Sequence, residues 1–156
     1  MDIQFKKGMI EDLDDCIKAM ENSSMCTAYF QSEESRKNAV MEGINKEALY
    51  VVVCDGECAG FAYFIAEGAF HAYHYVHLIT INEEYRGKGI GKKLLEFIEN
   101  ILFETRDKIF LLVGDYNPGA KIFYEKLGYK QVGTIPSLYR KGIDEYLMMK
   151  VYEGEN

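Results

Sequence analysis

The chain has 156 residues, of which 48% are hydrophobic and 13% aromatic, so it can bury the core of one domain and is not disordered. Its 18 basic and 25 acidic side chains give a formal net charge of -7, which argues against nucleic acid as a partner because duplex binding requires a basic surface. Any phosphate group must therefore be met by a local basic patch.

The first part of the chain predicts one strand and two helices. Apolar and polar residues alternate over residues 2–7, as in a short half-buried strand. Apolar residues recur at helical spacing over residues 13–20 and again over residues 33–44, where Ser32 can cap the second helix. The connection at residues 25–31 carries enough apolar surface to cover a cleft, although a loop packed on the core fits equally well.

Three strands are predicted next. Residues 48–54 and 57–65 flank Asp55-Gly56, which is the strongest hairpin signal in the chain because this pair readily forms a tight turn. Residues 71–81 are rich in aromatic and β-branched residues and predict a third, long strand. Strict alternation along it would place Tyr75, His77, Ile79 and Ile81 on one face and His74, Val76, Leu78 and Thr80 on the other.

The C-terminal half predicts two helices and three further strands. A helix over residues 90–105 precedes a short, buried strand over residues 108–114. In the next helix Asn117 is the expected cap, Pro118 the first residue and Gly128 the left-handed residue at the end. The remaining segments are a strand at residues 129–135, a loop at residues 136–142 and a strand at residues 144–152.

The cysteines and the hydropathy pattern bear on location. Four cysteines without an apolar leader ahead of them favour free thiols in a reducing cytoplasm over a secreted disulfide framework. The longest apolar run, residues 48–54, is far shorter than the roughly 20 residues of a membrane-spanning helix. We therefore expect a cytoplasmic protein with no membrane segment.

The segment E-Y-R-G-K-G-I-G-K-K, residues 84–93, lies between a predicted strand and a predicted helix. Its three glycines allow backbone amides to face a ligand, and the helix N-terminus with its neighbouring basic side chains favours a pyrophosphate group. The glycine spacing is neither that of the dinucleotide fingerprint nor that of a P-loop, which also needs a hydroxyl residue where Lys93 stands.

The pattern R-x-x-G-x-G, formed by Arg86, Gly89 and Gly91, is followed by N-P-G-A-K-I-F-Y-E-K-L-G-Y at residues 117–129. Together these motifs resemble the GNAT superfamily of acetyl-CoA-dependent N-acetyltransferases. The resemblance extends over almost the whole chain and implies an α/β fold, with a mixed, mostly antiparallel central sheet and helices on both faces, in a single domain over residues 1–156. It also implies acetyl-CoA as the cosubstrate and no metal.

The resemblance further assigns roles toward acetyl-CoA. The strands before and after the glycine segment diverge in such enzymes, and the backbone of Ile79 and Ile81 would pair with pantetheine in the gap, with the Ile81 amide directed at the thioester oxygen. Tyr124 is the expected general acid for the departing thiolate, and Asn117 caps its helix and contacts the cosubstrate. The full expected cosubstrate set is Ile79, Ile81, Arg86, Gly87, Lys88, Gly89, Ile90, Gly91, Lys92, Asn117 and Tyr124.

The group that deprotonates the acceptor amine is harder to assign. Many GNAT enzymes carry a glutamate on the inward face of the strand before the glycine segment, but residues 71–81 contain no carboxylate. His77, with an ordinary pKa of about 6.5, is the favoured base, with water or a purely structural role for this histidine as alternatives. A metal held by His71, His74 and His77 is not expected, because this spacing alternates between the faces of a strand.

Acceptor specificity is expected in residues 25–31 and 136–142. The candidate acceptor-binding residues are Tyr29, Phe30, Tyr75, Tyr139 and Arg140. Arg140 would either bind a carboxylate of the acceptor or face solvent. The resemblance implies acetyl transfer to a primary amine of a small molecule or peptide, and a direct ternary complex because no cysteine is placed to carry an acyl group. The alternative is a non-catalytic acetyl-CoA-binding sensor, and an exposed terminal strand would permit a homodimer.

Overall fold

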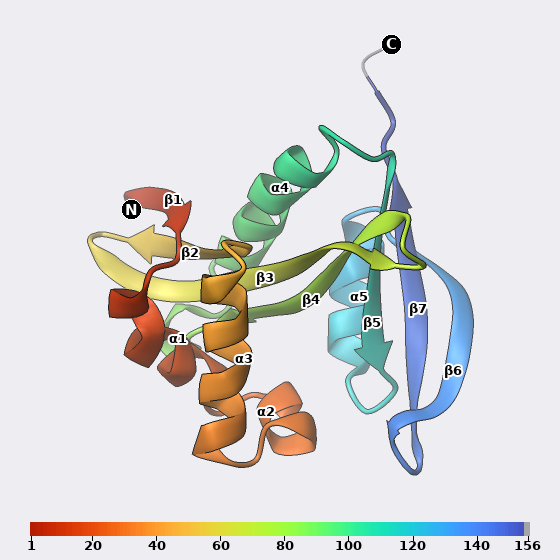
Figure 1. The fold of residues 1–156 in the computed structure, drawn as a ribbon, viewed down its shortest axis with the longest axis horizontal. Coiled ribbons are helices and arrows are strands. Elements are labelled where there is room, and N and C mark those ends of the chain that lie inside the picture. Colours follow the sequence, from red (N-terminus) through yellow and green to blue (C-terminus); the bar gives the residue numbers. More distant parts are fainter. Residues whose placement is uncertain (155–156) are drawn as a thin grey trace.

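The computed structural model describes residues 1–154. Seven strands form one mixed sheet in the order β1-β2-β3-β4-β5-β7-β6 (Figure 1). The strands are β1 (Ile3–Lys7), β2 (Leu49–Cys54), β3 (Glu57–Ala69), β4 (Tyr73–Ile81), β5 (Lys108–Gly114), β6 (Lys130–Arg140) and β7 (Ile143–Val151). The α-helices are α1 (Leu13–Met20), α2 (Ser24–Tyr29), α3 (Glu33–Asn45), α4 (Ile90–Leu102) and α5 (Pro118–Lys126), with single 3-10 turns at Ile10–Asp12 and Glu83–Tyr85.

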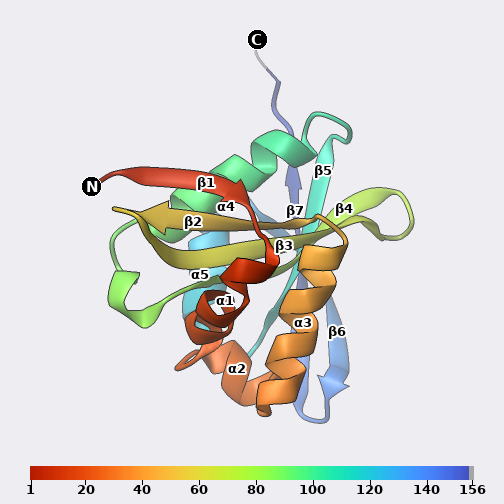
Figure 2. The same ribbon diagram turned by 60° about the vertical axis from the view of Figure 1, so that its left-hand side comes forward.

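The helices cover both faces of the sheet, as predicted (Figure 2). α1 and α3 bury Met20 and Val40 against β2 and β3 on one face, and α4 buries Leu94, Leu95 and Ile98 on the other. Each helix presents one apolar stripe to the sheet, because removing apolar surface from water is the main force that stabilises such layers. Within residues 1–154 no helix combines the length and the apolar character needed to cross a membrane.

β4 and β5 run parallel and pair with each other over only a short segment. Its pairing begins at His74 with Ile109 and ends at Val76 with Leu111. On the other side of β4, Tyr63 pairs with Leu78 while its neighbour Phe64 pairs with Val76, so His77 is an extra residue in β4. Such a β-bulge bends a strand, and β4 separates from β5 at this residue. Over residues 77–81 the β5-facing edge of β4 is consequently unpaired within residues 1–154.

The bulge overturns the predicted alternation along β4. Thr80 donates a hydrogen bond to the Ala19 carbonyl of α1 at 2.9 Å, and Leu78 packs with α1 and α3. Val76 and Ile79 instead pack on the α4 side. Strict alternation, which places Val76 with Leu78, is therefore wrong, because one inserted residue moves every later side chain to the opposite face.

Several predicted boundaries also change. Most of the connection predicted at residues 25–31 belongs to helix α2, which spans Ser24–Tyr29 and whose cap Ser23 accepts a hydrogen bond from the Cys26 amide at 3.0 Å. The predicted loop at 136–142 belongs mostly to the β6–β7 hairpin, since β6 runs to Arg140; Pro136 is tolerated there because β6 is an edge strand. β3 runs to Ala69 rather than 65, β4 begins at Tyr73 rather than 71, and α4 ends at Leu102 rather than 105.

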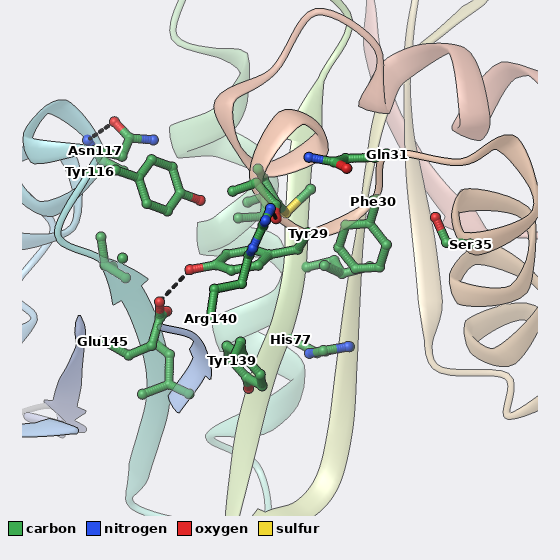
Figure 3. Close-up of a pocket in the computed structure, with 18 of the residues that line it drawn as sticks. Tyr29, Phe30, Gln31, Ser35, His77, Tyr116, Asn117, Tyr139, Arg140 and Glu145 are labelled. Carbon is green, nitrogen blue, oxygen red and sulfur yellow. Dashed lines mark hydrogen bonds between the residues drawn. The ribbon is translucent and has the colours of Figure 1, made fainter. Parts of the chain in front are cut away.

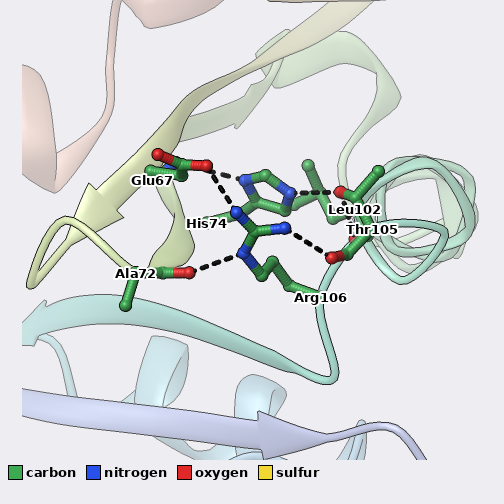
Figure 4. Close-up of polar contacts among 6 residues, drawn as sticks. All are labelled: Glu67, Ala72, His74, Leu102, Thr105 and Arg106. Carbon is green, nitrogen blue, oxygen red and sulfur yellow. Dashed lines mark hydrogen bonds and ion pairs between the residues drawn. The ribbon is translucent and has the colours of Figure 1, made fainter.

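His74 is held in a polar cluster with Glu67, Thr105 and Arg106 (Figure 4). Its Nδ1 accepts from the Glu67 amide at 3.2 Å and its Nε2 lies 2.7 Å from the Thr105 hydroxyl. Because Nδ1 accepts, the ring is neutral and donates through Nε2. Arg106 closes the cluster by donating to Glu67 and to the Ala72 and Thr105 carbonyls. Burial, with a smaller contribution from Arg106, lowers the pKa of His74 below its ordinary 6.5.

The protein is expected to lose stability as the pH falls from about 7.5 to about 5.5. In the unfolded chain each histidine binds a proton at its ordinary pKa of 6.5, whereas folded His74 and His77 both have lowered pKa values. The stability that their neutral forms contribute is therefore complete above the ordinary pKa and is lost progressively below it. Thermal unfolding followed by circular dichroism checks this, and His74→Gln should make the slope shallower. His71→Asn is the control, because His71 is exposed and asparagine tolerates its left-handed backbone (φ 58°). An unchanged slope in His74→Gln would contradict the assignment.

Candidate functional site

Two cavities meet where β4 and β5 separate. One, of about 560 Å³, is bordered by residues 85–92, and the other, of about 830 Å³, extends toward α2 and the β6–β7 hairpin. They share four lining residues, Ile79, Asn117, Ala120 and Tyr124. Two ligands, one in each cavity, would therefore face each other beside Tyr124.

The smaller cavity has a backbone cradle at the start of α4. Gly87 and Gly89 adopt the left-handed conformation, with φ of 78° and 79°, which disfavours other residues. Gly89 is the N-cap of α4, and within residues 1–154 no side chain caps this helix. The first-turn amides of α4 are thus left for an external acceptor, and an anion suits them because the helix dipole is positive at this end.

Gly91 keeps the smaller cavity open by having no side chain. A Cβ atom built on it would lie 3.6 Å from Ile81 Cγ1 and 3.7 Å from Phe123 Cζ, and both of these residues line the cavity. The Cβ itself would fit in ordinary contact, but any longer side chain would extend into the space between β4 and α5.

The Arg86 side chain lines this cavity, but its guanidinium is bound to backbone carbonyls and is not a free cation. Its Nε donates to the Ile81 carbonyl at 2.8 Å, and its two terminal nitrogens donate to the carbonyls of Asn22 at 2.8 Å and Glu21 at 3.2 Å. The guanidinium thus joins the glycine segment to the end of β4 and to the α1–α2 connection. The other predicted cosubstrate residues also line the cavity, except Lys88, whose Nζ lies 5.7 Å from the ring centroid of Tyr85.

On α5, Asn117 and Tyr124 occupy the positions predicted for them. The Asn117 side-chain oxygen caps the helix by accepting from the Ala120 amide at 3.1 Å. The Tyr124 ring packs edge-on against Tyr129, with centroids 5.8 Å apart. Burial raises the pKa of Tyr124, so its phenol stays protonated at neutral pH and can donate a proton.

The larger cavity is walled by aromatic side chains (Figure 3). All the predicted acceptor residues line it, namely Tyr29, Phe30, Tyr75, Tyr139 and Arg140, together with His77. Tyr29 stands at the centre of this wall, with its ring centroid 5.6 Å from that of Tyr139 and 5.8 Å from that of Tyr116. Arg140 spans from β6 to α2, because its guanidinium donates to the Ala28 carbonyl at 2.9 Å.

His77 lies in the larger cavity but is not strongly basic. Its Nδ1 is buried and has no hydrogen-bond partner within residues 1–154, and its ring meets Tyr63 edge-on at 5.5 Å. Burial, reinforced by Lys46 and opposed by Glu42, lowers the pKa of His77. The ring is therefore neutral at pH 7.

Among residues 1–154, Glu145 is the charged residue of the larger cavity that was not predicted from the sequence. No carboxylate stands on β4, but this one reaches the cavity from β7, only 2% exposed, and accepts a hydrogen bond from the Tyr29 hydroxyl. It lies opposite Gly114 in the β5–β7 pairing, and a Cβ on Gly114 would be 3.1 Å from the Glu145 carboxylate. The only local signal was the alternating pattern of the last strand, which does not show that β7 is inserted next to β5.

Burial is the main reason that the pKa of Glu145 is raised above its usual range. The nearby Asp115 carboxylate raises the pKa further, while the hydrogen bond from Tyr29 lowers it. The same cluster raises the pKa of Tyr29 through burial and through its hydrogen bond to Glu145.

Known proteins resemble this chain in sequence and in fold. Residues 17–129 match the family described as "Acetyltransferase (GNAT) family". An uncharacterized N-acetyltransferase of Methanocaldococcus jannaschii is 34% identical over 103 residues, covering 65% of this chain and 64% of that protein. The N-alpha-acetyltransferase RimI of Mycobacterium tuberculosis is 32% identical over 97 residues, covering 61% and 60%. The matched segments thus span less than two thirds of these two relatives.

The fold comparison extends over nearly the full chain. The PaiA N-acetyltransferase of Thermoplasma acidophilum, solved in complex with coenzyme A, superposes with a TM-score of 0.75 over 97% of this chain and 100% of that one, at 24% identity. The predicted mixed sheet with helices on both faces is therefore confirmed as the fold of these acetyltransferases.

Proposed function

The chain belongs to the acetyltransferase (GNAT) family, and from this premise we propose that it transfers an acetyl group from acetyl-CoA to a primary amine of a small molecule or peptide. One observation carries the proposal: two cavities of different chemistry meet at Tyr124, one with a backbone cradle for an anion and the other with an acidic, aromatic wall. An anionic cosubstrate and a cationic acceptor would meet in such a site.

The smaller cavity fits acetyl-CoA, which supplies an activated acetyl thioester when bound. The uncapped amides at the start of α4 and the backbone of residues 87–91 would hold its pyrophosphate. The pantetheine arm would lie along the unpaired edge of β4, which includes Ile79 and Ile81. It would bind there as an added strand binds to the edge of a sheet. Asn117 would contact the cosubstrate and fix the start of α5, while Lys88, which does not line the cavity, would contribute only to the local positive field.

Tyr124 is the proposed proton donor for the leaving thiolate. It borders both cavities, and its phenol is protonated at neutral pH, as a general acid must be. Direct transfer in a ternary complex is supported by the lining of the cavities, since no cysteine borders either of them within residues 1–154. All four cysteines are free thiols, which also supports the proposed reducing, cytoplasmic location.

The sensor alternative has lost its main support. It depended on the lack of a carboxylate for amine deprotonation, and Glu145 lies in the larger cavity. Release of the free thiol of coenzyme A, measured over a panel of polyamines, amino acids, aminoglycosides and peptides, tests the proposal. Steady release with at least one amine is expected. Tight coenzyme A binding in calorimetry without release from any amine would favour the sensor instead.

A further inference from the structure

We propose that Glu145 receives the ammonium group of the acceptor and takes its proton, and that the acceptor accordingly carries no carboxylate beside its amine. This inference rests on the proposed acetyl transfer to an amine. It names the base of the reaction, which the sequence analysis placed at His77, and it narrows the class of acceptor.

The Glu145 carboxylate is buried without a cation beside it among the described residues. Glu145 is 2% exposed, yet no basic side chain within residues 1–154 lies within 4.0 Å of its carboxylate. The Tyr29 hydroxyl is its one side-chain hydrogen-bond donor among these residues. A buried carboxylate is costly unless a cation or several donors accompany it, so the position favours a ligand that brings a positive charge.

The wall around the Glu145 carboxylate is aromatic. Tyr29, Tyr116 and Tyr139 surround the carboxylate side of the cavity, with the Tyr29 ring edge-on to both of the others. Electron-rich ring faces attract ammonium groups, and the attraction strengthens where water is excluded. Carboxylate and rings together form a receptor for an organic cation.

The charges around Glu145 also disfavour a carboxylate on the acceptor. The titratable and charged groups around Glu145 are Tyr29 of α2, Tyr75 and His77 of β4, Asp115 and Tyr116 after β5, Tyr124 of α5, and Tyr139 and Arg140 of β6. Arg140 is the one permanent cation in this set, and one nitrogen of its guanidinium donates to the Ala28 carbonyl, which directs the group toward α2. Of the two roles expected for Arg140, binding an acceptor carboxylate or facing solvent, the proposal excludes the first, because Glu145 and Asp115 would repel a carboxylate there.

The proton balance needs two acceptors, and the site has both. As the acceptor nitrogen binds the acetyl carbon, the carbon–sulfur bond breaks and the ammonium group loses two protons. One passes to Glu145 before attack and then to solvent, and the other replaces the proton that Tyr124 gives to the thiolate. The raised pKa of Glu145 makes it a better base near neutral pH than an exposed glutamate.

The first test compares acceptors that differ only in a carboxylate. Thiol release is measured with tyramine against tyrosine, histamine against histidine, and agmatine against arginine, since each of these amino acids has its single primary amine beside the carboxylate. In every pair of which the protein acetylates at least one member, kcat/KM is expected to be higher for the decarboxylated amine than for the amino acid by about tenfold or more, since juxtaposed like charges cost several kcal/mol. An amino acid used as well as its amine partner would overturn the inference but leave acetyl transfer standing. Coenzyme A binding without thiol release from any of these or from peptides would overturn the proposed function itself and this inference with it.

The second test separates Glu145 from His77. Glu145→Gln is expected to lower kcat/KM by about 100-fold and to remove the fall in activity on the acid side of the pH profile. Tyr29→Phe should move that fall to higher pH, because its hydrogen bond no longer lowers the pKa of Glu145. Asp144→Asn is the matched control. It removes a carboxylate from the residue directly before Glu145 in β7, which lies outside the cavity, and should leave the pH profile unchanged. An acid-side fall that persists in Glu145→Gln and disappears in His77→Asn would assign the proton to His77 and refute the proposal.

Discussion

Gly91→Leu is expected to abolish coenzyme A binding without unfolding the protein. The Cβ position lies between Ile81 and Phe123 in the smaller cavity, and the rest of a leucine side chain would fill the space that a ligand needs. We expect the affinity for coenzyme A to fall by about 1,000-fold, equivalent to roughly 4 kcal/mol, in isothermal titration calorimetry. Gly91 is the second residue of α4, where replacing glycine favours the helix, so Tm should be unchanged or slightly higher.

Two controls make this result specific. In Gly91→Ala the added Cβ stays in ordinary contact at 3.6 Å and 3.7 Å, so the affinity should fall by less than about tenfold. Gly119 holds the same second position in α5, but a Cβ there meets only the Asn117 side chain at 3.7 Å, so Gly119→Leu should bind coenzyme A normally. Full coenzyme binding by a folded Gly91→Leu protein would show that this cavity is not the cosubstrate site.

Tyr124→Phe is expected to lower kcat by about 1,000-fold while leaving coenzyme A affinity nearly unchanged. The change removes only the hydroxyl, and with it the proton offered to the leaving thiolate, while the ring still packs against Tyr129. Steady-state thiol release and calorimetry measure the two quantities separately. If Tyr124 were only a packed aromatic side chain, kcat would fall by no more than a few-fold.

Tyr146→Phe is the matched control for Tyr124. This variant also removes a phenol hydroxyl, but Tyr146 lies on β7 outside both cavities. Its ring centroid is 4.8 Å from Lys121 Nζ. Its kcat should match that of the unaltered protein. Equal losses in the two variants would point to a general effect on packing and not to proton donation by Tyr124.

Features that depend on a few neighbouring residues were predictable. Asn117, Pro118 and Gly128 were expected to cap, begin and end one helix; in the structure Asn117 caps α5, Pro118 begins it, and Gly128 follows it with φ of 98°. The glycine segment was likewise expected to turn backbone amides outward, and Gly87 and Gly89 have the left-handed conformation that this requires. Capping and backbone freedom are local effects, so residue type and spacing were enough.

Features set by distant pairing were not predictable. α2 has six residues, too few for a periodic apolar pattern, and Ser23 at its cap is its clearest local mark. The bulge at His77 is defined by how β4 pairs with Tyr63 and Phe64 of β3, which alternation within β4 does not record. As a result the side chains after His77 were assigned to the wrong faces.

By itself, the sequence determined the cradle at the start of α4, because the residues that form it are contiguous and their backbone conformations follow from glycine. The tertiary structure alone decided the larger cavity. Glu145 and Tyr29 are 116 residues apart in the chain, and they meet because β7 inserts between β5 and β6 while α2 covers the end of the sheet. Strand order results from burial of the whole sheet against its helices, a property of the complete fold that no local pattern carries.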